Sequence, residues 1–171
     1  MVNYRNEAVT LFNKKVYEEF MEKVKAFEKK LALTDFDKKT KAEYLEIVEE
    51  CYFHYARARQ LEAEYGELSR ESDKYNKLYR EAPTDQKAEE YKKKFYEIQG
   101  RMVRIESHHE LAKQDMQMCQ PNAQRVNIAV EDRIVELQEN RGKTGPGPSN
   151  KNGSGKSLAE MANQRRNAKK K

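Results

Sequence analysis

The chain has 171 residues, of which 37 % are hydrophobic and 37 % are charged, and it contains no tryptophan. This composition is typical of elongated helices with one buried stripe rather than of a globule with a thick core, and the length allows one domain and a tail. Two cysteines and the absence of a long apolar run exclude a disulfide framework and a transmembrane segment. We therefore expect a protein with reduced thiols that is neither secreted nor membrane-bound, and whose location is intracellular (cytoplasmic, or associated with a nucleoid or virion).

The net charge of +5 is unevenly distributed along the chain. Residues 142–171 contain eight basic side chains and a single acid, Glu160, which gives this segment a charge of +7. Residues 1–141 carry 26 basic and 28 acidic side chains, a balance of −2. The high isoelectric point is therefore a property of the C-terminal segment, and the rest of the chain is close to neutral.

The stretch from residue 85 to residue 119 contains an unbroken heptad pattern. Its apolar positions, which we call the seam, alternate in steps of three and four residues, and they are Ala88, Tyr91, Phe95, Ile98, Met102, Ile105, His109, Ala112, Met116 and Cys119. A helix with such a stripe is stable in water only when that face packs against another helix. The pattern therefore predicts a long helix that forms one half of a helical pair, with His109 as the only clearly polar seam residue.

Apolar residues at similar steps predict three more helices. The four predicted helices cover residues 3–33, 35–81, 85–120 and 122–141. Pro121 is expected to end the third helix, because proline lacks the backbone donor that a continuing helix needs.

Short connections determine how these helices are arranged. Thr34 is the predicted N-cap of the second helix, with Asp37 as the acid of a capping box, and Thr84 is the predicted N-cap of the third helix. The connection at residues 81–84 is so short that the second and third helices must be antiparallel neighbours. The expected fold class is all-α: a long antiparallel helical hairpin, or coiled-coil bundle, of three to four helices with a disordered basic C-terminal tail.

The C-terminal segment has two parts. Residues 142–157 contain no hydrophobic side chain and are expected to form a flexible linker rich in Gly, Pro, Ser and Asn. In residues 158–171, a capping box of Ser157 and Glu160 precedes a small apolar face, which predicts a short helix. Such a segment is too short to be helical alone, so we expect it to become ordered only on a partner.

The basic side chains of this segment are the candidate binding residues. A flexible tether that ends in a basic cluster favours the capture of phosphates, with counterion release supplying the affinity. The segment lacks aromatic residues that stack on bases, so binding without sequence preference is expected. The same residues also fit an acidic protein surface, or a tail that only increases solubility. They are Lys143, Lys151, Lys156, Arg165, Arg166, Lys169, Lys170 and Lys171.

A zinc site is the first chemical alternative, because the chain contains Cys51, His54, His108, His109 and Cys119. In a hairpin that turns near residue 83, the numbers of facing residues add to about 166, which places residue 115 opposite Cys51. His109 and Cys119 would then lie about 15 Å apart along the helix axis, on opposite sides of that level, too far to share one metal ion. We therefore predict two buried thiols, a histidine that fixes register, and no metal site.

Two further motifs are incomplete. Glu106 and His109 match half of a di-iron motif, but no second pair has the required spacing. The sequence from Gly153 to Ser157 ends like a phosphate-binding loop, but position 150 is asparagine rather than glycine and no strand precedes it. The sequence therefore predicts no catalytic residue and no cofactor.

Together these features predict a non-enzymatic structural or assembly protein. The helical body would mediate protein–protein contacts or self-association, and the basic tail would bind nucleic acid without sequence specificity, as in virion-internal, scaffolding or nucleoprotein-associated proteins. The alternative is an adaptor or assembly chaperone whose C-terminal basic helix docks on an acidic protein partner. A metal-dependent helical-bundle enzyme is the third hypothesis.

Overall fold

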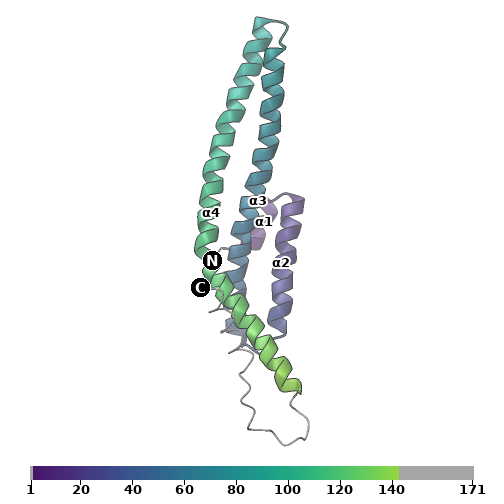
Figure 1. The fold of residues 1–171 in the computed structure, drawn as a ribbon, viewed down its shortest axis with the longest axis vertical. Coiled ribbons are helices and arrows are strands. Elements are labelled where there is room, and N and C mark those ends of the chain that lie inside the picture. The colour runs from purple at the N-terminus through teal and green to yellow at the C-terminus, as the bar shows by residue number, and fades with distance from the viewer. Residues whose placement is uncertain (1, 143–171) are drawn as a thin grey trace, which may run out of the picture. The chain divides into compact units, whose positions relative to one another are not determined.

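A computed structural model describes residues 2–142, and Figure 1 shows their path. The described part of the chain consists of four α-helices and the loops between them: α1 (Tyr4–Leu11), α2 (Lys14–Ala32), α3 (Lys38–Arg80) and α4 (Asp85–Gly142). The predicted all-α fold class is confirmed, as is the antiparallel hairpin. Apart from Gly142, the predicted linker over 142–157 and tail over 158–171 lie outside the described residues.

The predicted helix over residues 3–33 was wrong, because the chain breaks it at Phe12 and Asn13. Phe12 has an extended backbone, with φ −99° and ψ 143°. The Asn13 side chain accepts a hydrogen bond from the Val16 backbone N–H at 2.9 Å, which makes Asn13 the N-cap of α2. The backbone N–H of Asn13 donates to the Gln60 side chain at 2.8 Å. The donor that a continuous helix would use internally is therefore satisfied by α3.

The predicted cap at Thr34 was also wrong. The Thr34 hydroxyl is buried and donates to the Leu31 carbonyl at 2.7 Å, so it belongs to the end of α2. Asp37 caps α3 by accepting from the Thr40 backbone N–H at 2.7 Å, and this hydrogen bond lowers the pKa of Asp37. The second helix therefore begins at Lys38 rather than at residue 35. Thr84 does cap the next helix, as predicted, by accepting from the Lys87 backbone N–H at 3.2 Å.

The predicted end of a helix at Pro121 was wrong as well. The predicted helices over 85–120 and 122–141 form one helix, α4, with 58 residues and Pro121 inside it. A proline inside a helix costs about 3 kcal/mol. Buried side chains lie on α4 on both sides of it, including Ala112 before the proline and Val126 and Val130 after it. Packing of these side chains offsets the cost of the proline.

The described residues form two compact units, which divide three of the helices between them. Of the described residues, unit 1 contains 2–23 and 49–120, and unit 2 contains 24–48 and 121–142. Unit 1 contains α1, the beginning of α2 and the hairpin of α3 and α4, which run side by side up to their short connection (Figure 1).

The core of unit 1 has an aromatic part and an aliphatic part. Phe12, Phe20 and Phe53 form a cluster with ring centroids 5.2 to 6.2 Å apart, and Tyr4 stacks on it 5.0 Å from Phe53. Further along the hairpin, two small clusters combine aliphatic side chains from the two helices: Ala58, Leu61 and Ala112, then Leu68, Ile98 and Met102. Aromatic packing therefore fixes α1 and α2 to α3, and aliphatic packing joins α3 to α4.

Unit 2 has a separate core and an ion-pair cluster. Phe27, Leu31 and Val130 are buried within it. Arg133 forms two hydrogen bonds of 2.7 Å with the carboxylate of Asp35, and this contact holds the pKa of Asp35 below its usual value. Such a fork-to-fork pair has a defined geometry, so it ties the loop after α2 to the last turns of α4.

Candidate functional site

The basic residues predicted to bind a partner, from Lys143 to Lys171, lie outside the described residues. The structure therefore describes candidate surfaces only on the helical body. Three of them contain functional side chains or exposed apolar ones: a groove between α3 and α4, a pair of cysteines near the base of the hairpin, and the outer face of α4.

The groove lies between α3 and α4 and has a volume of about 310 Å³. Each helix contributes three side chains at the same spacing, i, i+1 and i+4, which places them on one side of the helix. Leu61 and Ile105 supply its apolar surface. The other four lining residues are polar, and they are Glu62, Tyr65, Glu106 and His109.

The polar side chains of the groove are paired across the two helices. His109 Nε2 lies 3.1 Å from the Glu62 carboxylate. Tyr65 forms a hydrogen bond with Glu106, and this contact raises the pKa of the tyrosine. His109 therefore lies half-buried on the seam and contacts α3, while its predicted role in fixing the register stays a prediction. In residues 2–142, no three His, Cys, Asp or Glu side chains are grouped so that they could hold a metal ion.

The cysteines lie closer together than the sequence predicted. Cys119 on α4 lies beside Cys51 on α3, and its thiol donates a hydrogen bond to the Met116 carbonyl at 3.3 Å. Both cysteines are half-buried, so the prediction of two buried thiols was wrong. The prediction placed residue 115 opposite Cys51, but Asp115 instead lies 3.9 Å from His54. The predicted register was therefore wrong by about one helical turn. Its physical reason is that interlocking side chains, such as Ser72 with Gln99 at 2.7 Å, determine the register rather than the midpoint of the loop.

The environment of Cys119 keeps its thiol protonated. Partial burial, followed by the neighbouring Cys51 side chain, raises the pKa of Cys119 from 9.0 to about 12. At pH 8 we expect iodoacetamide to modify Cys119 about a thousandfold more slowly in the folded protein than in urea, because three pKa units reduce the thiolate fraction by that factor. Since the unfolded thiol ionises at lower pH, stability should also fall as the pH rises from 9 to 12.

Mass spectrometry of tryptic peptides measures this alkylation rate site by site. A Cys51→Ser variant provides the control, because it changes the neighbouring side chain while Cys119 keeps its half-buried position. Equal rates for Cys119 in folded and unfolded protein would contradict the protonated thiol.

The outer face of α4 contains a stripe of exposed side chains that the sequence analysis missed. The large members are Tyr96, Val103, Leu111 and Met118, with 62, 61, 57 and 78 % of their surface exposed. Between them lie Gly100, Ser107 and Gln114, which are exposed as well. We call these seven residues the outer stripe. None is charged, although 37 % of all residues in the chain are.

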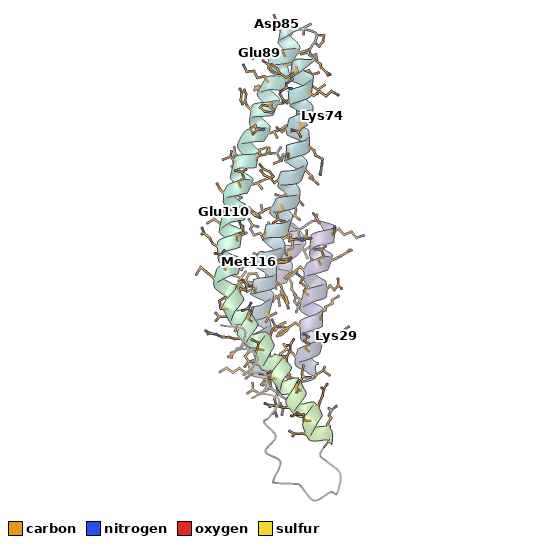
Figure 2. All side chains as sticks on the ribbon, viewed as in Figure 1. Lys29, Lys74, Asp85, Glu89, Glu110 and Met116 are labelled. Carbon is orange, nitrogen blue, oxygen red and sulfur yellow. The ribbon has the colours of Figure 1, made fainter. Side chains whose placement is uncertain are left out.

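The outer stripe and the seam lie on different faces of the same helix. Every seam position from Ala88 to Cys119 is buried or half-buried, whereas every position of the outer stripe is exposed. Figure 2 labels a residue of each kind on α4: Met116, which packs against the hairpin core, and Glu110, an exposed residue beside the outer stripe. The sequence contained a signal for this stripe. From Tyr96 to Met118, positions separated by steps of 4, 3, 4, 4, 3 and 4 residues, the spacing of one helix face, are all uncharged.

Comparison with known proteins adds no assignment. No family model, no curated protein and no solved structure matches this chain. None of the helices in the described part of the chain combines the length and the apolar character that a membrane span requires. A functional proposal therefore depends on the surfaces described above and on the distribution of charge.

Proposed function

We propose that this chain is a non-enzymatic structural or assembly protein whose helical body contacts other proteins and whose basic C-terminal segment binds nucleic acid without sequence preference. The observation that carries the proposal is the outer stripe of α4. It spans residues 96–118, none of its seven side chains is charged, and at 1.5 Å per residue it is about 33 Å long. Isolated exposed apolar residues are normal on a protein surface, but four large ones along one uncharged face of a helix favour an interaction site.

The groove between α3 and α4 supports a structural role rather than a catalytic one. Its two carboxylates are engaged by Tyr65 and His109 from the opposite helix. A general acid or base must be able to reach a substrate proton, whereas these groups hold one helix against the other. Pairing between α3 and α4 accounts for the positions of these four side chains without a catalytic role.

Charge distribution supports the second half of the proposal. Residues 142–171 carry eight basic side chains and one acid. Phosphate contacts by such residues release condensed counterions, which gives affinity that does not depend on sequence and falls steeply with salt.

The test compares the binding of labelled duplex DNA and RNA by two variants of the full chain. The first replaces the five terminal basic residues with alanine: Arg165, Arg166, Lys169, Lys170 and Lys171. The matched control replaces five exposed lysines of the helical body: Lys25, Lys29, Lys38, Lys39 and Lys93. Both variants lose five positive charges, so they differ only in where the charge is removed.

Binding is measured over a salt series. If the five terminal residues neutralise five phosphates, the slope of log K against log salt should become less steep by about 4.5 in the terminal variant. The body variant should keep the slope of the unmodified chain. Absence of binding by the unmodified chain at low salt, or equal losses in both variants, would contradict the proposal. Circular dichroism of a peptide of residues 157–171 separates the alternative: helix induced by an acidic protein but not by nucleic acid would favour an adaptor.

A further inference from the structure

The outer stripe is symmetrical about Ser107. Val103 and Leu111 lie four residues on either side of it, Gly100 and Gln114 seven residues, and Tyr96 and Met118 eleven residues. When two such helices pack antiparallel with Ser107 opposite Ser107, each member of a pair faces the other member on the second copy. A two-fold interface requires this self-complementarity, because residue i of one copy contacts residue j of the other and the reverse.

We propose that the outer stripe is an interface between two copies of this chain, packed antiparallel about a two-fold axis at Ser107. The inference deepens the proposed function by naming a partner for the helical body, and it rests on the proposed premise that the body makes protein contacts. Along this interface, Val103 faces Leu111 twice and Tyr96 faces Met118 twice. Sulfur beside an aromatic ring is a favourable contact, and the four large side chains alternate with smaller ones.

Small residues in the stripe allow the two helices to approach each other. A Cβ atom added to Gly100 would meet no atom within 4 Å, so the space beside it is open. No glycine in the described residues has a positive φ, so the backbone does not require glycine at this position. Glycine inside an exposed helix is unfavourable compared with alanine. Close approach of a second helix would explain both Gly100 and the small Ser107 on the two-fold axis.

Charged residues border the stripe without entering it. Arg104 follows Val103 directly on one side, and Glu110 precedes Leu111 on the other. Glu110 forms an ion pair of 3.3 Å with Lys113, which keeps its charge compensated on its own helix. A weakly apolar centre with a polar rim is the usual composition of a protein interface.

The size of the stripe predicts a weak dimer. With a length of about 33 Å and a helix width of about 10 Å, the footprint is about 330 Å² on each copy. Stable interfaces bury about 800 Å² on each partner. The dimer should therefore be weak and should form only at high protein concentration. Several copies held on one nucleic acid would raise the effective concentration and populate it further.

The first test measures self-association of the full chain by sedimentation equilibrium up to about 500 µM, a range set by the small footprint. Val103→Lys alone and Leu111→Glu alone should each lower the association constant at least about tenfold, because each places a charge against an apolar side chain. The double variant should recover most of the loss, because each lysine then faces a glutamate of the other copy. In a parallel dimer, lysine would face lysine and no recovery would follow.

A matched control separates this effect from a general effect of charge. Val9 on α1 is exposed to the same degree as Val103, 64 % against 61 %, and lies outside the stripe. Val9→Lys should leave the association constant unchanged. Circular dichroism confirms that every variant keeps its helix content.

The second test determines the register by crosslinking, with Cys51 and Cys119 replaced by serine and oxidised glutathione as the oxidant. Two thiols then form one disulfide as the glutathione disulfide is reduced to two thiols. Ser107→Cys should give a covalent dimer. Gly100→Cys should not crosslink with itself but should crosslink with Gln114→Cys. Self-crosslinking of Gly100→Cys would overturn the antiparallel arrangement.

Nucleic-acid binding, measured on the same samples, separates this inference from the proposed function. A chain that remains monomeric at 500 µM and still binds DNA or RNA through its basic segment would overturn the inference alone. A dimer disrupted by Val103→Lys, in a chain without nucleic-acid binding, would support the inference and overturn the nucleic-acid half of the proposed function.

Discussion

Replacing Phe20 with alanine is expected to lower the free energy of unfolding by about 3 to 5 kcal/mol. Only 1 % of Phe20 is exposed, and its ring lies 6.0 Å from that of Phe12 and 6.2 Å from that of Phe53, in edge-on contact with both. Alanine would remove these contacts and leave a cavity where α2 packs on α3. Urea denaturation followed by circular dichroism at 222 nm measures the change.

Two control variants test the assignment of this loss to the cavity. Phe20→Leu keeps most of the buried volume and should cost less than half as much as Phe20→Ala. Val9→Ala removes an exposed side chain and should change the free energy of unfolding by less than about 0.5 kcal/mol. A loss below about 1 kcal/mol for Phe20→Ala would mean that the aromatic cluster is not packed as described.

Replacing Ile98 with alanine is expected to cost about 2 to 5 kcal/mol. Ile98 is buried between Leu68 and Met102, with Tyr65, Tyr75 and Ile105 packed around them. This part of the hairpin has only two helices, so few other contacts replace those that are lost. Hydrogen exchange should show the loss of protection first in residues 65–105, because local packing determines local opening.

Leu111→Ala is the matched control for Ile98→Ala, since both residues lie on α4 and Leu111 is mainly exposed. In protein too dilute for the proposed dimer to form, the control should change stability by less than about 0.5 kcal/mol. Equal effects of the two variants would contradict the separation of α4 into a buried seam and an exposed outer stripe.

The periodic parts of the fold could be predicted because hydrophobic spacing is a local property. Every seam residue from Ala88 to Cys119 is buried or half-buried, and the turn with its cap at Thr84 lies where it was expected. Ile98 is fully buried as the seam required, whereas Phe95 is only half-buried because the hairpin is a thin layer at that point.

The wrong predictions concern helix ends that depend on contacts with residues far away in the sequence. Asn13 is a good N-cap, but its backbone N–H is satisfied by Gln60, which is 47 residues away in the sequence. A local pattern cannot contain that partner, so the break between α1 and α2 was missed. Pro121 shows the reverse: its local cost predicted a helix end, and packing on both sides of it overcame that cost.

The candidate surfaces could be predicted only in part. The predicted role of His109 followed from its seam position, but its partner Glu62 depends on a register that the loop midpoint placed about one turn away. The outer stripe could have been found, because a run of uncharged positions at helical spacing is unusual in a chain so rich in charge. Apolar periodicity does not reveal it, because Gly100, Ser107 and Gln114 are not apolar.

The short turn before Thr84 also has a consequence for the order of folding. The further a contact between α3 and α4 lies from the turn, the more residues separate its two partners in the sequence. The separation is 27 residues for Ser72 with Gln99 and 47 residues for Glu62 with His109. The entropy lost on closing a loop grows with its length, so contacts near the turn form at the smallest cost. The hairpin should therefore close like a zipper from its tip, and the two cysteines at its base should be among the last residues to meet.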